Sequence, residues 1–276
     1  MIETLMKHLI SMNNKYGQVI WSEPDSHIAD AIIKHGVYDE HAIHYIEKIL
    51  QAMPDKPIVL DIGAHIGNHA LIMTRFSKMV YCFEPLTENV TVLQRNQSEN
   101  HIQNMQIFPF ALSDKNETLT FYKDGSTFVS DLQHAGSATE ILTCKIGDEV
   151  LQENQIHRID FIKIDVEGFE AQALRGLSNI IKSSQPVVMM EWNNDTTREL
   201  FAKYNLFNDV FKGYQIRALS HNHQKHYWGP KWYWQLARFI YRKIVPKRRL
   251  LTHFTPEGEY TNILLFPAEK SWVAAL

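Results

Sequence analysis

The feature that most constrains this chain is a buried-strand pattern that breaks into a glycine-bearing turn near residue 60. The segment Val59-Leu-Asp-Ile-Gly-Ala-His-Ile-Gly67 predicts a strand, a turn and the start of a helix. Its glycines, Gly63 and Gly67, follow a G-x-x-x-G spacing, which matches neither the dinucleotide fingerprint G-x-G-x-x-G nor the phosphate loop G-x-x-x-x-G-K-S/T. The turn lacks the extra glycine and the lysine with which those motifs hold a pyrophosphate, so it predicts a ligand without one.

Two acids accompany this turn. Asp61 lies on the strand that leads into it, and Glu84 ends the next predicted strand, 79–84. A carboxylate about 20 residues after such a turn commonly accepts hydrogen bonds from ribose hydroxyls. The sequence therefore predicts a nucleoside ligand without phosphates, and S-adenosylmethionine fits this description best.

Strand and helix patterns alternate after residue 57, which predicts an α/β fold with a mostly parallel sheet and helices on both faces. The alternating segments are 57–62, 67–76, 79–84, 88–98, 105–109, 118–122, 141–145, 159–164, 168–181 and 186–191. A closing strand is predicted at 260–266. The expected organisation is an N-terminal extension, a ligand-binding core, a basic insertion, and a closing strand with a tail, over residues 1–56, 57–209, 210–256 and 257–276.

The N-terminal extension is expected to be helical and amphipathic. Asp25 or Ser26 is suited to cap a helix that begins near Ile28, and Gly36 ends it. A second helix is expected from about Asp39 to Met53, before the Pro54-Asp-Lys-Pro57 turn.

The composition is that of a globular protein, with 45% hydrophobic residues among 276 and a formal charge of −3. Cys82 and Cys144 lie in apolar strand-like segments, so we expect buried thiols and a reducing compartment. The N-terminus has an early acid and no apolar run of signal-peptide length, and no stretch approaches the ~18–20 apolar residues that span a bilayer. These observations predict a cytoplasmic protein.

Residues 210–256 form a basic segment with ten Lys and Arg and no Asp or Glu. Within it, 231–249 predict an amphipathic helix. Its apolar face holds Trp232, Leu236, Phe239, Ile240 and Ile244, and its polar face holds Gln235, Arg238 and Arg242. Three alternatives stay open: peripheral contact with the inner face of an anionic membrane, packing on the domain as a lid over the acceptor, and, less favoured, nucleic acid.

Two polar segments are predicted to be irregular. The 126–139 region is expected to form a surface loop or short ribbon near the cofactor edge. His221-Asn-His-Gln-Lys-His226 has no neighbouring Cys or acid, so a solvated loop is favoured over a metal site.

Acids gather where the predicted strands end, the edge at which open α/β sheets bind ligands. The segment Ile159-Asp-Phe-Ile-Lys-Ile-Asp-Val-Glu-Gly-Phe-Glu170 ends in Asp165, Glu167 and Glu170, and Glu191 ends the next strand. Three acids within six residues repel one another, so they are expected to line a polar cleft, meet cations or act as charges at a helix N-terminus. Glu170 is suited to capping or to a partner in the core.

Taken together, these motifs resemble the FkbM-type S-adenosylmethionine-dependent methyltransferases. The matching pieces are Gly36-Val-Tyr38 with Glu40, Asp61-Ile-Gly-Ala-His-Ile-Gly67, Phe83-Glu-Pro85, Asn96, Ala111-Leu-Ser-Asp114, Lys163-Ile-Asp-Val-Glu-Gly-Phe-Glu170 and the strand 186–191. The resemblance implies a Rossmann-like class I methyltransferase fold and methylation of a hydroxyl oxygen of a sugar or polyketide product.

The resemblance also implies the cofactor site. Carried over by position, its residues are Asp61, Gly63, His65, Gly67, Glu84, Ala111, Asp114 and Asp165. The turn would hold the methionine part, Glu84 the ribose hydroxyls, and the 111–114 segment would lie beside the adenine. His65 stands where the family usually has Asn, which affects the contact to the amino-acid part of the cofactor.

Catalysis is expected to need positioning and a base. The sulfonium is an activated donor, whereas a sugar hydroxyl is weakly acidic and must lose its proton as the C–O bond forms. Asp165 or Glu167 is the expected base, and Glu191 is expected to orient the acceptor or assist. In an alternative mechanism Asp165, Glu191 and Asn193 hold Mg²⁺, an ion that prefers oxygen ligands, but a metal-free site is favoured.

The predicted function is thus S-adenosylmethionine-dependent O-methylation of a saccharide hydroxyl, on a lipid-linked or surface-polysaccharide precursor. Two alternatives belong to other classes: methylation of RNA or of a protein side chain, and a non-catalytic scaffold that keeps the fold and acts through residues 210–256.

Overall fold

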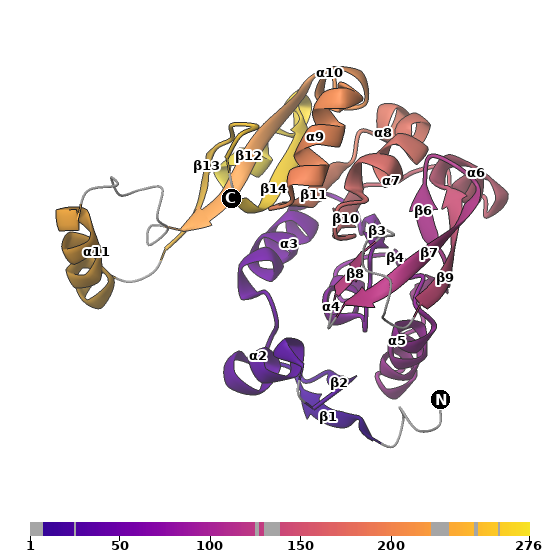
Figure 1. The fold of residues 1–276 in the computed structure, drawn as a ribbon, viewed down its shortest axis with the longest axis horizontal. Helices are drawn as coiled ribbons and strands as arrows, with labels where there is room; N and C mark the ends of the chain where they lie inside the picture. Colours follow the sequence, from indigo (N-terminus) through magenta and orange to yellow (C-terminus); the bar gives the residue numbers. More distant parts are fainter. Residues whose placement is uncertain are drawn as a thin grey trace.

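Within the residues that the structure describes, eight strands form the central sheet (Figure 1). The computed structural model describes residues 8–24, 26–124, 127–129, 139–221, 232–245, 248–258 and 260–276. In spatial order the strands are β13 (Arg249–His253), β12 (Tyr214–His221), β14 (Tyr260–Pro267), β11 (Val187–Trp192), β10 (Phe161–Ile164), β3 (Ile58–Ile62), β4 (Met79–Phe83) and β5 (Met105–Phe108).

Strand directions give this sheet a doubly wound topology. Strands β5, β4, β3, β10 and β11 are parallel neighbours. Strand β14 is antiparallel to both β11 and β12, so β12 runs in the same direction as β11. The order is that of a dinucleotide-binding sheet with one antiparallel strand, β14, inserted before the last parallel one and a second antiparallel strand, β13, added at the edge. The predicted Rossmann-like α/β fold and the closing strand are therefore confirmed, and the carboxyl ends of β3, β10, β11 and β12 share one edge.

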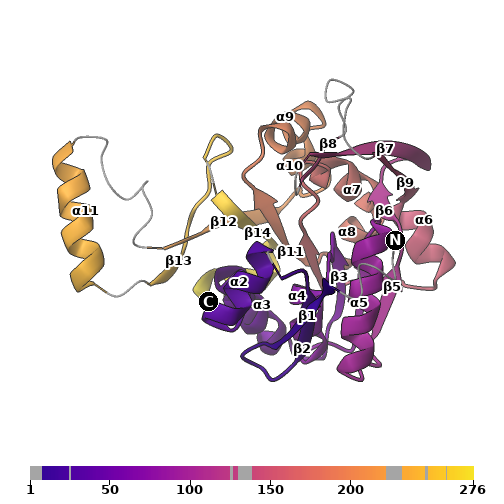
Figure 2. The same cartoon turned by 60° about the horizontal axis from the view of Figure 1, so that its bottom comes forward.

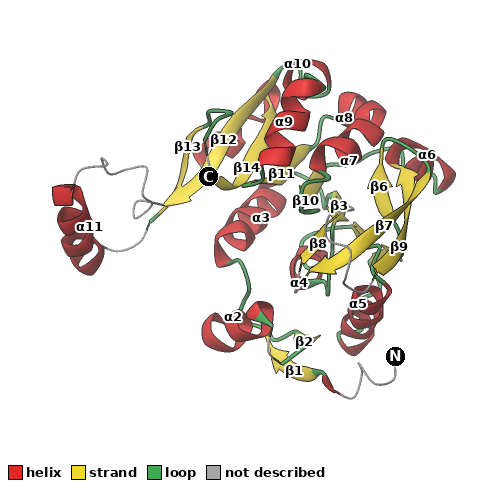
Figure 3. Ribbon diagram, viewed as in Figure 1, coloured by secondary structure: helices red, strands yellow, loops and turns green. Residues whose placement is uncertain are grey.

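Helices cover both faces of the sheet (Figure 3). Successive residues of a strand point to opposite faces of the sheet, and in β3 both sets are apolar. Leu60 and Ile62 belong to the buried cluster on one face, and Val59 belongs to the cluster on the other. The first face carries α6 (Gly147–Glu153), α7 (Glu170–Gly176), α8 (Ser178–Ser184), α9 (Asp195–Lys203) and α10 (Leu206–Asp209). The second carries α3 (Glu40–Ala52), α4 (Asn68–Thr74), α5 (Thr87–Glu99) and the 3₁₀ segment η3 (Ala268–Ala275).

A smaller sheet follows β5 in the chain. Its order is β6 (Ala111–Ser113), β9 (Thr139–Ile146), β7 (Glu117–Asp124) and β8 (Thr127–Val129). The short strand β8 pairs antiparallel with β7. This pairing agrees with the short ribbon that was one of the two predictions for the 126–139 region. Residues 130–138 and 222–231 lie outside the described part, and with them most of the histidine-rich 221–226 segment.

The N-terminal prediction is wrong over residues 10–22, which form a β-hairpin instead of a helix. Strands β1 (Ile10–Asn13) and β2 (Val19–Ser22) pair antiparallel. The side chain of Asn14 accepts hydrogen bonds from the backbone N–H groups of Tyr16 and Gln18, and Gly17 adopts φ +80°. This local turn chemistry outweighs the amphipathic pattern.

The two predicted helices beyond the hairpin are present. Ser26 caps α2 (His27–His35) through the Ala29 N–H, and Gly36 ends it at φ +77°. Asp39 caps α3 in the same manner through Ala42.

Asn96 of α5 and Asn100, the residue that caps the end of this helix, bind the hairpin to the core. Asn96, fully buried, accepts from the Trp21 N–H at 2.7 Å and donates to Trp21 O and to Ile66 O. Asn100 accepts from the Val19 N–H and donates to Val19 O. The side-chain amides thus satisfy the free edge of β2, and Asn96 ties the hairpin to the glycine turn before α4.

Both cysteines are free and buried, as predicted from their apolar surroundings. Burial raises the pKa of the Cys82 thiol, which keeps it protonated. Among the described residues, no helix has the length and apolar character to cross a bilayer.

The helix predicted in the basic segment is α11 (Trp232–Ile244). Figures 1 and 2 show it standing away from the rest of the fold, beyond the ends of β12 and β13. In this structure it does not cover the carboxyl ends of β10 and β11, so its action as a lid stays a prediction.

Candidate functional site

The β3–α4 turn brings the backbone against the end of β10. Gly63 adopts φ +82°, and a Cβ there would lie 1.9 Å from the carbonyl oxygen of Asp165. Gly67 adopts φ +90°, and its Cβ would lie 2.4 Å from Cδ1 of Leu93. Both positions require glycine, because any side chain would collide with Asp165 or Leu93 and because both residues have a positive φ. The two glycines therefore allow the turn to pack directly against β10 and α5.

Buried polar atoms without partners line this turn. Among the described residues, Oδ2 of Asp61 and Oδ1 of Asn68 are buried and have no hydrogen-bond partner. Burial raises the pKa of Asp61 to about 7, although the charge of Lys163 opposes the shift. Buried acceptors of this kind are stabilised by a ligand with N–H or O–H donors, as the amino-acid part of S-adenosylmethionine has.

Glu84, directly after β4, is buried and oriented by three hydrogen bonds. Its Oε2 accepts from the backbone N–H of His65 at 2.8 Å, and its Oε1 accepts from the Leu86 N–H and the Asn89 amide. A carboxylate has about four acceptor positions, so one remains on Oε2 for a ribose hydroxyl. The residues present therefore fit a nucleoside cofactor.

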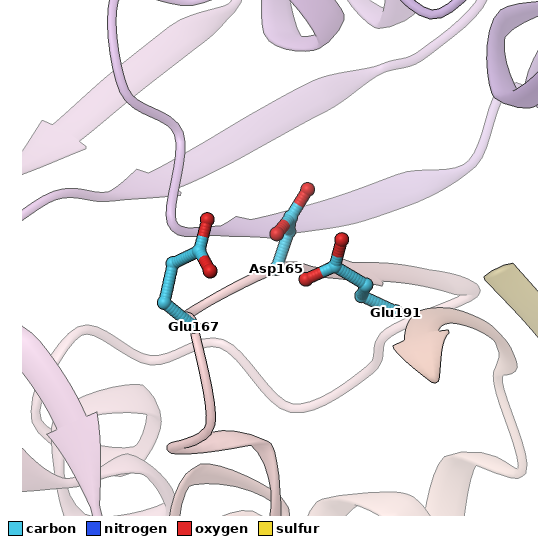
Figure 4. Close-up of side chains that lie close together, drawn as sticks. All are labelled: Asp165, Glu167 and Glu191. Atoms are coloured by element: carbon cyan, nitrogen blue, oxygen red, sulfur yellow. The ribbon is translucent and has the colours of Figure 1, made fainter. Parts of the chain in front are cut away.

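Asp165, Glu167 and Glu191 converge at the carboxyl ends of β10 and β11 (Figure 4). One carboxylate oxygen from each lies within 4.8 Å of the other two. Asp165 and Glu167 follow β10, and Glu191 belongs to β11. The structure thus brings together the three predicted catalytic residues, which we call the acid group.

Glu170 holds the loop that carries the acid group. Its Oε1 accepts from the N–H groups of Val166 and Gly168, and its other oxygen accepts from the Thr197 hydroxyl. Glu167 and Gly168 adopt φ +51° and φ +100°, which places the Glu167 side chain beside Asp165. Helix α7 has no side-chain cap at its N-terminus, so of the two predicted roles of Glu170 the structure shows the partner in the core, buried against Thr197.

Lys163 is the cation of the site, and no role was predicted for it. Its side chain is 1% exposed, and its Nζ donates to Oδ2 of Asp165 at 3.0 Å. It also lies opposite Asp61 in the β10–β3 register. Burial lowers the pKa of Lys163, but the charges of Asp165 and Asp61 outweigh burial and raise it, so the lysine stays charged.

The pKa values of Asp165 and Glu191 are shifted in opposite directions. Burial raises the pKa of Asp165, but the charge and hydrogen bond of Lys163 outweigh burial and lower it. Burial, followed by the charges of Asp165 and Glu167, raises the pKa of Glu191 to about 8. At neutral pH Asp165 is therefore ionised and Glu191 protonated, with Asp165 able to accept a proton from a nearby hydroxyl.

Tyr38 and Asp39 of the N-terminal extension lie beside the site, together with His69 of the core. His69 of α4 places Nε2 3.8 Å from Oδ2 of Asp39, and the Tyr38 ring packs edge-on against His69. Burial lowers the pKa of His69 to about 4, so it is neutral. Burial and the charge of Asp39 raise the pKa of Tyr38, so its phenol stays protonated. Roles for His69 and Asp39 were missed from the sequence.

Asp114, one of the predicted cofactor residues, lies apart from the acid group. It follows β6, where its carboxylate forms an ion pair with Arg175 of α7. Asn193 donates its amide to Oε1 of Glu191 at 2.6 Å and therefore lies beside the acid group. The Mg²⁺ mechanism with Asp165, Glu191 and Asn193 stays a prediction. The adenine role of Ala111 and Asp114 stays a prediction.

The raised pKa of Glu191 gives a pH-dependent stability. An acid whose pKa rises on folding stabilises the fold below its ordinary pKa and loses that contribution as pH rises through the folded value, here about 8. We expect Glu191→Gln, which cannot ionise, to gain Tm relative to wild type as pH rises from about 5 to about 9. Thermal unfolding across this range measures the difference, with exposed Glu99→Gln as control. Parallel curves for wild type and Glu191→Gln would contradict the proton assignment.

The fold and this carboxylate-lined edge define a class I methyltransferase. The family model for the methyltransferase FkbM domain matches residues 61–216, more than half of the chain. The chain therefore belongs to the FkbM methyltransferase family.

Individual relatives are more distant. The hexuronic acid methyltransferase AglP of Haloferax volcanii is 26% identical over 146 residues, which are 52% of this chain and 59% of that protein. Methyltransferase 1 of Beauveria bassiana is 24% identical over 150 residues, 46% of this chain and 60% of that protein. The chain thus spans about three-fifths of their length. A crystal structure of methyltransferase FkbM from Methylobacillus flagellatus matches with 14% identity and a TM-score of 0.47, covering 96% of this chain and 58% of that one.

Proposed function

We propose that this protein transfers a methyl group from S-adenosylmethionine to a hydroxyl oxygen of a saccharide. The observation that carries the proposal is the acid group, in which Asp165, paired with the buried Lys163, lies beside Glu191 at the carboxyl ends of two neighbouring strands. A weakly acidic hydroxyl requires such a base. A relative that acts on a hexuronic acid supports a sugar acceptor, and a lipid-linked or surface-polysaccharide precursor is the finer proposal.

Each residue has a distinct part in the proposed reaction. When bound, the cofactor supplies an electrophilic methyl group that needs no further activation. Asp165 accepts the hydroxyl proton on the oxygen that Lys163 leaves free, while Lys163 holds the other oxygen in place. Glu191, which forms a hydrogen bond with Asp165, is proposed to orient the acceptor. The phenol of Tyr38 lies within range of the charges of Asp165 and Glu191. Glu167 lies at the exposed rim of the acid group, where burial and the charge of Asp165 raise its pKa.

The cofactor is proposed to bind along the β3–α4 turn and β4. Asp61 and the glycine turn of Gly63, His65 and Gly67 would hold the amino-acid part, and Glu84 the ribose. Ala111, Asp114 and Asp165 stay proposed cofactor contacts by position. The unpartnered Asp61 oxygen and the remaining acceptor on Glu84 support this placement.

The cofactor site is tested by titration with S-adenosylhomocysteine in a calorimeter. We expect Glu84→Ala to weaken binding by about 30-fold or more, because a hydrogen bond to a charged group contributes about 2 kcal/mol. The exposed Glu99→Ala on α5 is the matched control. Unchanged affinity in a folded Glu84→Ala would contradict the ribose assignment, and no binding to the wild type would favour the scaffold alternative.

Mg²⁺ remains the second mechanism, because the acid group has the oxygen chemistry and spacing of a divalent-cation site. Lys163 argues against it, since this buried ammonium already supplies the positive charge next to Asp165. Repeating the titration and the methyl-transfer assay with EDTA and with added Mg²⁺ separates the two mechanisms.

The other proposals concern partners and place. Methylation of RNA or of a protein side chain is the alternative acceptor class, and filter retention of RNA at physiological salt tests the RNA version. A cytoplasmic location is proposed from the two buried free cysteines. Peripheral contact with the inner face of the membrane is proposed from the amphipathic helix at 231–249. The chemistry of that contact can be argued further from α11.

A further inference from the structure

Helix α11 leaves the fold from the edge that carries the acid group. Strand β12 ends at His221, β13 begins at Arg249, and these two strands pair as the stem that flanks the insertion. Because β12 runs in the same direction as β11, its carboxyl end lies at the same sheet edge as Glu191. Figures 1 and 2 show α11 held away from the body at the end of this stem.

Large apolar side chains are exposed on one face of α11. Ile244 is 73% exposed, Phe239 57%, Ile240 48% and Tyr233 44%. At 100° per residue these four positions fall within about 140° of the helix circumference. They make up four of the six large hydrophobic residues that are exposed in the described part of the chain. We call this set the α11 apolar face.

Charge separates this segment from the rest of the molecule. Residues 210–256 contain ten Lys and Arg and no acid, whereas the rest of the chain has 18 Lys and Arg against 31 Asp and Glu. An anionic surface therefore attracts the segment and repels the body. The charge distribution favours contact through α11 alone.

We infer that α11 docks on an anionic lipid bilayer, with the α11 apolar face in the headgroup region and the basic segment against the lipid charge. A helix of 13 residues with bulky apolar groups on one face and cations nearby has the properties of an interfacial helix. Docking would turn the strand edge with the acid group toward the membrane surface. This last consequence rests on the proposed function, and the docking itself does not.

Two other occupants fit less well. A second copy would bring one basic segment against another, which repels at physiological salt. A nucleic acid would satisfy the cations but would leave Ile240 and Ile244 in water. A bilayer surface satisfies both the charge and the apolar area.

The test is co-sedimentation of the full chain with vesicles, without cofactor or acceptor. We expect binding to phosphatidylcholine vesicles that contain about 30% phosphatidylglycerol, release by high salt, and little binding to phosphatidylcholine alone. Ile240→Asp/Ile244→Asp should weaken binding by about tenfold or more. The matched control is Ile33→Asp/Ile141→Asp, which places the same two substitutions on exposed isoleucines of α2 and β9.

Several outcomes would overturn the inference. One is wild-type binding that the Ile240→Asp/Ile244→Asp variant retains, and another is no binding of the folded wild type to anionic vesicles. A dimer that this variant abolishes in sedimentation would assign the face to a second copy. Retention of single-stranded RNA by both wild type and variant, without vesicle binding, would assign it to nucleic acid. The vesicle assay contains no cofactor or acceptor, so its result does not depend on methyl transfer. Vesicle binding would support docking even if the methyltransferase proposal failed, and a lack of binding would not contradict methyl transfer.

Discussion

Replacing Asp165 by Asn is expected to lower kcat for methyl transfer by about a thousandfold, the typical contribution of a positioned base. The substitution keeps the shape of the side chain but removes the ionised oxygen that accepts the hydroxyl proton. Transfer of labelled methyl from S-adenosylmethionine to a hexuronic-acid glycoside measures the rate. The affinity for S-adenosylhomocysteine, measured separately, is expected to change by much less than kcat.

The other two acids provide the matched controls. Glu191→Gln keeps a hydrogen-bond donor next to Asp165, as the protonated Glu191 does, so a smaller loss of about tenfold is expected. Glu167 lies at the rim of the acid group, so Glu167→Gln is expected to lower kcat by less than about tenfold. Equal losses in all three variants would point to Mg²⁺ held by the acid group. A small loss in Asp165→Asn would indicate an acceptor that is already ionised, such as a carboxylate, and would contradict a hydroxyl acceptor.

Much of the fold follows from local patterns in the sequence. The strand before Gly63 and those at 79–84, 159–164 and 186–191 are short apolar runs that end in acids or turn residues, and the structure has them within a few residues. The β-hairpin at 10–22 was missed although Asn14 and Gly17 form its turn locally. Asn96 and Asn100, which bind the edge of β2, lie 75 residues or more further along the chain and leave no local signal. An amphipathic pattern cannot distinguish a short helix from a strand that is satisfied by distant side chains.

The acid group was predictable because strand ends meet at one edge of a parallel sheet. The role of Lys163 was also predictable, because a lysine inside the apolar run Phe161-Ile-Lys-Ile164 is buried and therefore needs a carboxylate as partner. The register that places it opposite Asp61 joins segments about a hundred residues apart, and no local pattern gives it. The same is true of Tyr38, Asp39 and His69, which approach the site only because α3 and α4 pack on the same face.

Lys163→Met is expected to destabilise the fold by about 3 kcal/mol, the typical effect of removing one partner from a buried ion pair. Methionine fills the same space, so the loss measures charge rather than packing. Asp61 and Asp165 are left without their cation. Asp61, which is buried, can then stay so only by taking up a proton, whereas Asp165 is 34% exposed. Urea unfolding at neutral pH measures the free energy of unfolding.

Lys182 gives the matched comparison, because its Nζ lies 2.7 Å from Asp209 on the exposed surface. Lys182→Met is expected to change the free energy of unfolding by less than about 1 kcal/mol. The double variant Lys163→Met/Asp165→Asn removes one of the two orphaned charges, so it should be more stable than Lys163→Met alone. If both lysine substitutions cost the same, Lys163 does not neutralise the site, and the ionised state of Asp165 loses its physical basis. If only Lys163→Met is severe and the double variant recovers stability, the buried ammonium is what keeps a charged base at the acceptor edge.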